Sequence, residues 1–143
     1  MNKLILIALS FSSLPLWGNY FVPPIQKPAV DSSTGFNVQP GFQVELVYQV
    51  DKKKYGSWIA MAFDHKGRLV VSDQDKAGTF IIDLPPVGET LQESMIKKLP
   101  LESSWRGMLF AFDHLYMCAQ NRVVRVPVSP EGEFGEMEKL FDQ

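Results

Sequence analysis

Cysteine is nearly absent from this sequence, since Cys118 is the only one among 143 residues. A single thiol excludes an internal disulfide, and the sequence has no Cys-x-x-Cys or Cys/His spacing for zinc or covalently attached haem. Cys118 lies in the apolar, strand-like run 115–119. We therefore predict a buried structural thiol rather than a reactive one.

A large excess of charge of either sign is also missing. Fourteen Lys and Arg residues are balanced by sixteen Asp and Glu, which gives a formal net charge of -2 at pH 7. Nucleic-acid-binding surfaces are normally basic and clustered, so this balance argues against a nucleic-acid partner. The only basic run is Lys52-Lys53-Lys54, and its place between strand-like segments indicates a solvated turn.

No apolar run is long enough to cross a bilayer, which takes about 20 residues. The longest one extends from Leu4 to Leu16, follows the positively charged Lys3, and is followed by Gly18. A charged start, a short apolar run and a small residue are the layout of a signal peptide, which we predict over residues 1–18, with export to the periplasm or the exterior. Because Leu16 is bulkier than the usual residue three positions before a cleavage site, an uncleaved N-terminal anchor is the alternative.

The region after the signal segment divides into two parts. Residues 19–40 hold four of the ten prolines and show neither helical nor strand periodicity, which indicates an irregular linker or arm. From residue 41 onward, apolar alternation and turn residues predict strands joined by short turns, with no amphipathic helix. We expect strands at 42–50, 57–63, 68–72, 79–84, 95–99, 105–112, 115–119, 122–128 and 137–141.

Within residues 41–143 this pattern occurs twice. Trp58 and Trp105 are 47 positions apart, and each precedes an apolar strand that ends in Phe-Asp-His, at 63–65 and 112–114, which we interpret as hairpin turns. Four strands in about 40 to 50 residues are typical of a β-propeller blade, because neighbouring blades bury one another's faces. We therefore predict an all-β fold, a partial β-propeller of about two four-stranded antiparallel blades. A β-sandwich would space its turns similarly and is the alternative.

Two blades are too few for a closed ring, which takes about four to eight. An open pair of blades leaves a sheet face and strand edges exposed. We expect the chain to be the N-terminal part of a longer protein whose remaining blades are its partners. Association of several copies is the alternative.

Few side chains suggest chemistry. The segment Asp73–Gly78 has two carboxylates two positions apart, but it lacks the third acidic ligand and terminal Glu of a calcium loop, so a polar inter-strand turn is the better interpretation. His65 and His114 occupy equivalent repeat positions, which argues against one shared metal site. The sequence has neither a Gly-x-Ser-x-Gly elbow nor a phosphate-binding loop.

The remaining candidates are arginines and tryptophans. Trp58 and Trp105 are interpreted as core anchors between blades rather than as sugar-stacking platforms. The arginines would bind an anion only if they converged in space; they are Arg68, Arg106, Arg122 and Arg125. We assign no residue a catalytic, cofactor-binding or metal-binding role.

Three segments carry a family resemblance: PGFQVELVY at 40–48, GSWIAMAFDHKGRLVVSDQ at 56–74 and WRGMLFAFDHLY at 105–116. In these segments the chain resembles large exported β-propeller proteins of planctomycetes and verrucomicrobia. Those proteins are related to glucose/sorbosone dehydrogenases and often carry a C-terminal c-type haem domain. The likeness covers most of the chain after the arm, and its motifs form blades rather than active sites.

The resemblance implies an exported propeller that oxidises sugars or alcohols with pyrroloquinoline quinone and passes electrons to haem. This chain lacks the Cys-x-x-Cys-His haem motif and the later blades in which such dehydrogenases place their catalytic base and quinone contacts. We therefore expect a scaffold portion that is inactive by itself and holds no cofactor; quinone and haem would belong to a longer protein. The alternative is a non-catalytic propeller-type module that binds a protein or carbohydrate partner.

Overall fold

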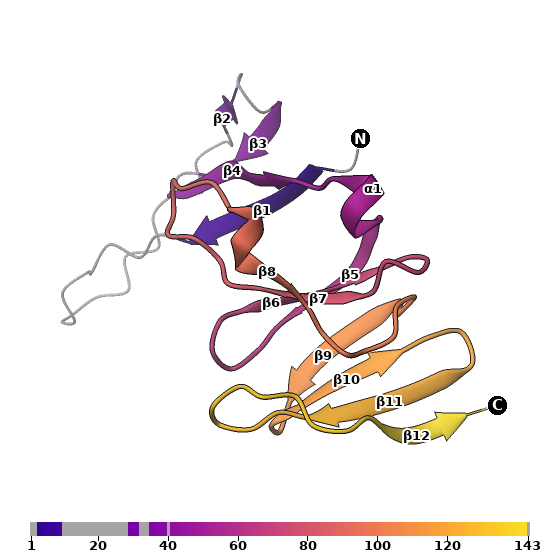
Figure 1. The fold of residues 1–143 in the computed structure, drawn as a ribbon. Coiled ribbons are helices and arrows are strands. Elements are labelled where there is room, and N and C mark those ends of the chain that lie inside the picture. Colours follow the sequence, from indigo (N-terminus) through magenta and orange to yellow (C-terminus); the bar gives the residue numbers. More distant parts are fainter. Residues whose placement is uncertain (1–2, 10–28, 32–34, 40, 143) are drawn as a thin grey trace, which may run out of the picture.

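A computed structural model describes residues 3–9, 29–31, 35–39 and 41–142, with the backbone alone described for 3–9 and 29–31 (Figure 1). Over these residues the fold is all-β, and its main elements are two four-stranded antiparallel sheets. This confirms the predicted all-β class and the four strands expected for each repeat, while the assignment of the two sheets to propeller blades stays a prediction.

The described residues form twelve strands, one helical turn and one 3-10 turn. They are β1 (Lys3–Leu9), β2 (Ala29–Asp31), β3 (Phe36–Val38), β4 (Phe42–Gln49), α1 (Lys52–Tyr55), β5 (Trp58–Phe63), β6 (Leu69–Asp73), β7 (Thr79–Ile82), the 3-10 turn η1 (Glu93–Met95), β8 (Ile96–Lys98), β9 (Gly107–Ala111), β10 (His114–Cys118), β11 (Arg122–Pro127) and β12 (Glu138–Asp142).

The first sheet has the order β5-β6-β7-β8. Its first hairpin closes through Asp64, whose side-chain carboxylate accepts from the backbone N–H groups of Lys66 and Arg68, both at 2.9 Å. Gly67 takes a φ of 75°, which a glycine adopts without steric cost. The hairpin turn expected at residues 64–67 is confirmed.

The second sheet has the order β12-β11-β10-β9, but its first hairpin closes differently. Phe112 and Asp113 both have positive φ, at 50° and 58°, and form a two-residue turn between β9 and β10. His114 is therefore the first residue of β10, and the predicted Phe-Asp-His turn is wrong at this position. The same three letters fall differently in the two hairpins because the second loop is shorter.

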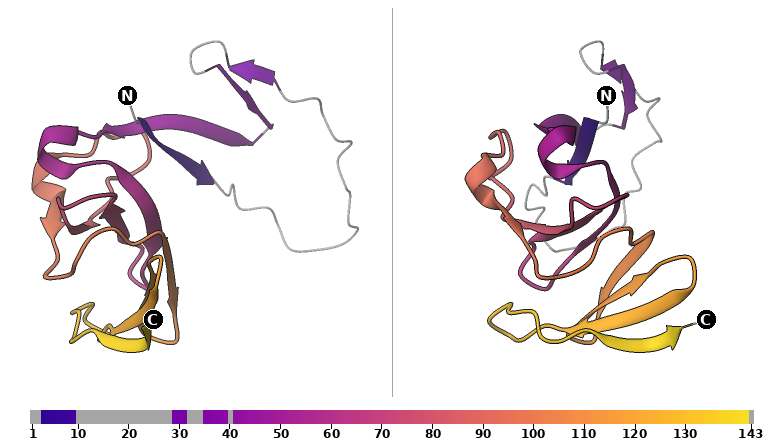
Figure 2. Two further views of the ribbon diagram at one scale, coloured as in Figure 1. Left: turned by 90° about the vertical axis from the view of Figure 1, so that its right-hand side faces the viewer. Right: turned by 45° about the vertical axis from the view of Figure 1, so that its right-hand side comes forward.

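The sheets form a stack of layers (Figures 1 and 2). Sheet β5–β8 lies in the middle, and one of its faces packs under β4 and α1 through Val47 and Tyr55. Its other face packs on sheet β9–β12. Both faces of the middle sheet are thus buried, which explains why β6 and β7 are buried along their whole length.

The N-terminal region departs from expectation in two places. The arm predicted to be irregular contains the antiparallel pair β2 and β3. Strands of three residues are too short to show an alternating pattern, so the sequence carried no signal for them. Residues 3–9, within the predicted signal peptide, form β1 and pair antiparallel with β4. The rest of the signal segment lies outside the described residues, and its cleavage stays a prediction.

Two smaller observations complete the fold. The lysine run forms the single turn α1, capped by Asp51 through the Lys53 N–H at 2.9 Å, and all three lysines are exposed, as expected of a solvated turn. Among the described residues, no helix is both long and apolar enough to cross a membrane.

Candidate functional site

The two tryptophans of the repeat are held in the same way. The indole Nε1 of Trp58 donates to the Tyr55 carbonyl at 3.2 Å, and that of Trp105 donates to the Glu102 carbonyl at 2.9 Å. In each case the acceptor lies three residues earlier in the chain. Both side chains are buried, in the two different cores. Both are core residues as expected, but only Trp105 lies between the two sheets, whereas Trp58 lies in the core under β4 and α1.

Trp105 joins the two sheets at what we call the inter-sheet interface. Its backbone N–H donates to Ser72 Oγ of β6 at 3.1 Å, and both residues are fully buried. The Arg122 guanidinium lies over its ring, 4.5 Å from the centroid. The interface consists of Val70 and Ile81 on the first sheet and of Trp105, Leu115, Met117, Val124 and Val126 on the second.

The segment before Trp105 fastens one end of this interface. Ser104 donates its backbone N–H to the Asp73 carbonyl at 2.8 Å, and its hydroxyl lies 2.8 Å from the carbonyls of Gln74 and Asp75. Thr79 Oγ1 bonds the Glu102 carbonyl on the same side. The turn after β6 is therefore tied to the start of the second repeat by main-chain and hydroxyl contacts.

Asp73 is the buried centre of that turn. Its carboxylate accepts three backbone N–H groups, from Ser57 at 2.6 Å, Asp75 at 3.0 Å and Ala77 at 2.8 Å. These bonds occupy the oxygens that a calcium ion would need. Across the described ranges, no group of three or more acidic, His or Cys residues could hold a metal. The geometry is that of the polar turn inferred from the sequence.

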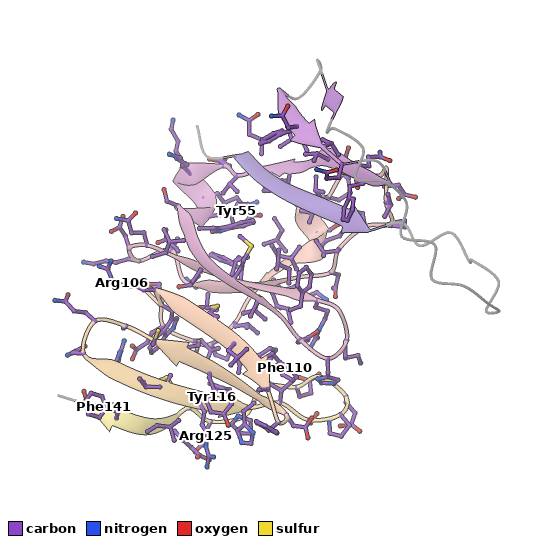
Figure 3. The ribbon with its side chains drawn as sticks, turned by 180° about the vertical axis from the view of Figure 1, so that it is seen from behind. Tyr55, Arg106, Phe110, Tyr116, Arg125 and Phe141 are labelled. Carbon is purple, nitrogen blue, oxygen red and sulfur yellow. The ribbon has the colours of Figure 1, made fainter. Side chains whose placement is uncertain are left out.

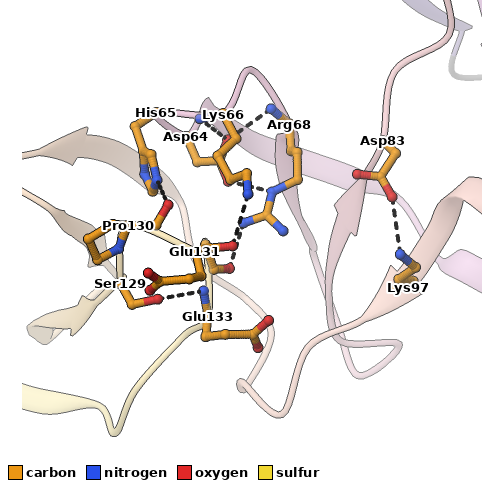
Figure 4. A network of polar contacts seen from close by, with 11 residues as sticks. Asp64, His65, Lys66, Arg68, Asp83, Lys97, Ser129, Pro130, Glu131 and Glu133 are labelled. Carbon is orange, nitrogen blue, oxygen red and sulfur yellow. Dashed lines mark hydrogen bonds and ion pairs between the residues drawn. The ribbon is translucent and has the colours of Figure 1, made fainter.

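The opposite end of the interface is closed by a polar network (Figure 4). Arg68 Nε donates to the buried Asp64 carboxylate at 2.7 Å, and its Nη2 donates to the Gly132 carbonyl at 2.6 Å. Beside it, His65 Nε2 donates to the Pro130 carbonyl at 3.2 Å, and Lys66 Nζ to that of Glu131 at 3.0 Å. The first hairpin of sheet β5–β8 is thus hydrogen-bonded to the loop between β11 and β12 through three side chains.

The histidines do not share a site. His65 contacts Pro130 and packs on the Phe110 ring at 5.4 Å, whereas His114 Nδ1 lies 2.6 Å from the Phe112 carbonyl and its ring lies beside Tyr116. Each imidazole therefore has a separate local role.

Three of the four candidate arginines are engaged at separate places. Arg68 binds Asp64, Arg122 binds Glu102, and Arg125 binds Glu138 at 2.7 Å. Arg106, the fourth, is exposed. The three paired guanidinium groups therefore do not form one anion site together.

A shallow hollow of about 410 Å³ lies at the end of the second sheet. Two of its polar lining groups are engaged locally, since His114 bonds Phe112 and Ser129 Oγ accepts from the Glu133 N–H at 3.3 Å.

Cys118 is exposed, so the predicted buried thiol is wrong. Alternate residues of β10 point to opposite faces, and the buried ones are Leu115 and Met117. Cys118 shares the other face with His114 and Tyr116. An apolar run indicated a strand correctly, but it did not indicate which of its faces is covered.

No family model, no curated protein and no solved structure matches this chain. The candidate site is the interface between the two sheets. The sequence did not single out Ser72, Ser104 and Gly132, because serines and glycines of this kind are common in turns and strands and their partners lie 30 or more positions away.

Proposed function

We propose that this chain is the N-terminal scaffold portion of an exported β-propeller related to the glucose/sorbosone dehydrogenases, supplying two consecutive blades and no active site of its own. The supporting observation is that two four-stranded sheets of the same strand order, each anchored by a tryptophan bonded three residues back, stack face to face. A two-sheet sandwich would leave the outer face of each sheet to solvent, whereas the first sheet here buries both faces.

The side-chain chemistry supports a structural role. The buried polar groups, Asp64, Ser72, Asp73 and Thr79, all bond backbone groups at the two ends of the inter-sheet interface. Polar groups held in this way fix the relative position of layers.

The test is to isolate the native polypeptide from its host with an antibody against residues 41–143. We expect a mass well above the 16.2 kDa of this chain and further Trp-led repeats on peptide sequencing. N-terminal sequencing should start close to Asn19, after removal of the signal peptide. A native polypeptide of 16.2 kDa or less would contradict the scaffold function.

An activity assay on the same preparation distinguishes a dehydrogenase from a non-catalytic binding module. Quinone-dependent reduction of a dye by the native polypeptide, with a sugar or alcohol as the donor, would assign it to the dehydrogenases. Absence of reduction by protein loaded with pyrroloquinoline quinone would assign it to the binding modules for a protein or carbohydrate partner. In either case we expect residues 1–143 alone to give no activity.

A further inference from the structure

The registers of the two sheets allow their residues to be matched one by one. Leu69 of β6 pairs with Phe63 and Ile82, and Leu115 of β10 pairs with Phe110 and Val126 in the same pattern. From this match the remaining positions follow along the strands. The equivalent pairs on one face are Leu69 and Leu115, Val71 and Met117, Phe80 and Val124, and Ile82 and Val126.

On the other face, four fully or nearly buried residues of the first sheet match four residues of the second that are not buried. The pairs are Val70 and Tyr116, Ser72 and Cys118, Thr79 and Val123, and Ile81 and Arg125. The first-sheet members are covered by sheet β9–β12, while no described layer lies over the second-sheet members. We call Leu109, Tyr116, Cys118, Val123 and Arg125 the open face; Tyr116 and Arg125 lie at the margin of the molecule in Figure 3.

The open face combines exposed apolar side chains with a charged group that is already paired, so another layer can cover it at low cost. Leu109, next to Tyr116 in the ladder, is 62% exposed, and Phe141, paired with Val123, is 51% exposed. Its one cation, Arg125, is already paired with Glu138 at 2.7 Å. Covering the face would therefore bury an ion pair rather than a lone charge, which avoids the larger cost of an uncompensated charge.

A second copy of this chain could not cover the open face in the way that the second sheet covers the first. The docking surface of the second sheet is formed by Leu115, Met117, Val124 and Val126. The equivalent surface of the first sheet is formed by Leu69, Val71, Phe80 and Ile82, and it is already buried under β4 and α1. A sheet that docks on the open face must have its own equivalent surface uncovered.

We infer that the open face is the docking surface for a further four-stranded antiparallel sheet of the same polypeptide, packed on β9–β12 as β9–β12 packs on β5–β8. The inference rests on the proposed function and names the partner of this surface. Cys118 takes the place of Ser72 in it, so the thiol faces the backbone that leads into the first strand of the incoming sheet.

The experiment uses the native polypeptide and follows the Cys118 peptide by mass spectrometry after maleimide labelling. We expect Cys118 to react at least about tenfold more slowly than a thiol introduced by Val87→Cys, because only the first is covered in the folded protein. Val87 lies in the loop before η1 and is 62% exposed. Denaturant should bring the two labelling rates together.

A matched pair of substitutions gives a second readout on the same polypeptide. Leu109 and Val87 are equally exposed in this chain, at 62%. Leu109→Asp should lower the unfolding temperature by several degrees, because it puts a charge into a covered apolar surface, whereas Val87→Asp should leave it unchanged.

The outcomes separate this inference from the proposed function. A polypeptide of 16.2 kDa contradicts the proposed function itself. A longer polypeptide in which Cys118 reacts as fast as the Val87→Cys thiol, and in which both aspartate variants unfold alike, overturns the inference and leaves the scaffold function standing. Protection of Cys118 that disappears on dilution would show a second copy on the open face and would also overturn it.

Discussion

The backbone N–H of Trp105 donates a 3.1 Å hydrogen bond to Ser72 Oγ, and both groups are fully buried between two sheets. The hydroxyl in turn lies 3.1 Å from the Asp73 carbonyl, to which it donates. A tryptophan that begins the second repeat is thereby joined directly to the second strand of the first. This bond fixes the start of the second repeat against β6 of the first sheet.

Removing the Ser72 hydroxyl should destabilise the protein measurably. Ser72→Ala leaves the Trp105 N–H buried without an acceptor, which costs about 1–3 kcal/mol. Ser129→Ala is the control, because its hydroxyl accepts a longer bond of 3.3 Å in an exposed loop and should cost less than about 0.5 kcal/mol. Urea unfolding of the two variants measures the difference. Equal midpoints would show that the Trp105–Ser72 bond does not hold the sheets together.

Gly56 and Gly67 offer a matched test of the turn around Asp73. Both have positive φ, 72° and 75°, so an alanine is strained at either position. Gly56 also has a ψ of -150°, a combination that only glycine adopts readily, which adds to the cost there. At Gly56 the new Cβ would also meet Asp73 Oδ1 at 2.0 Å, whereas at Gly67 nothing lies within 4 Å.

Gly56→Ala should therefore unfold at clearly lower urea concentration than Gly67→Ala, since it displaces the carboxylate that bonds Ser57, Asp75 and Ala77. Thermal unfolding followed by circular dichroism should rank the stabilities of the two variants in the same order. Indistinguishable variants would mean that Asp73 moves aside without loss, contrary to its role as the centre of this turn.

Arg68 and Arg125 test the polar network that closes the interface. Arg68 pairs with an Asp64 side chain that is 0% exposed, while Arg125 and Glu138 are 37% and 51% exposed. Arg68→Ala removes bonds to the buried carboxylate and to the Gly132 carbonyl, and we expect a loss of about 2–3 kcal/mol. Arg125→Ala should cost less than about 1 kcal/mol in this chain. A chemical denaturation series that reverses this order would contradict the assignment of the network to the interface.

Tyr48 predicts a pH dependence. Burial raises the pKa of its phenol above the usual 10.0, with the negative potential of Tyr55 as a second cause. The folded protein then holds this proton more tightly than the unfolded chain, so the free energy of unfolding should fall as the pH rises above about 10. Tyr48→Phe should remove this part of the fall. Ultraviolet titration of the Tyr48→Phe variant should show one fewer phenol among those that ionise at the highest pH. A titration curve unchanged from that of the parent protein would refute the assignment to Tyr48.

The strands after residue 41 were largely predictable from their apolar patterns, and β5, β6 and β7 each end at or directly before an aspartate. The turn at 64–67 was predictable for the same reason. The turn at 112–113 was not, since the same Phe-Asp-His letters close a four-residue turn once and a two-residue turn once. Three-residue strands such as β2 and β3 carry too few positions for a period to be read.

The candidate interface illustrates the same limit. Trp58 and Trp105 could be chosen from the repeat, but Ser72 and Ser104 could not, because a serine in a strand or turn has no signature of its own. Cys118 was assigned to the wrong side of its strand. Local apolar character shows that a residue lies in a strand, and the packing of distant segments shows which side is covered.

By itself the sequence determined the fold class, the two repeats and the positions of most strands, because these depend on side-chain period and turn chemistry within a few residues. Only the tertiary structure decided which sheet face lies on which, and that the first sheet is covered twice while the second is covered once. Those features depend on contacts between residues more than 15 positions apart, and no local pattern records the partner of such a contact.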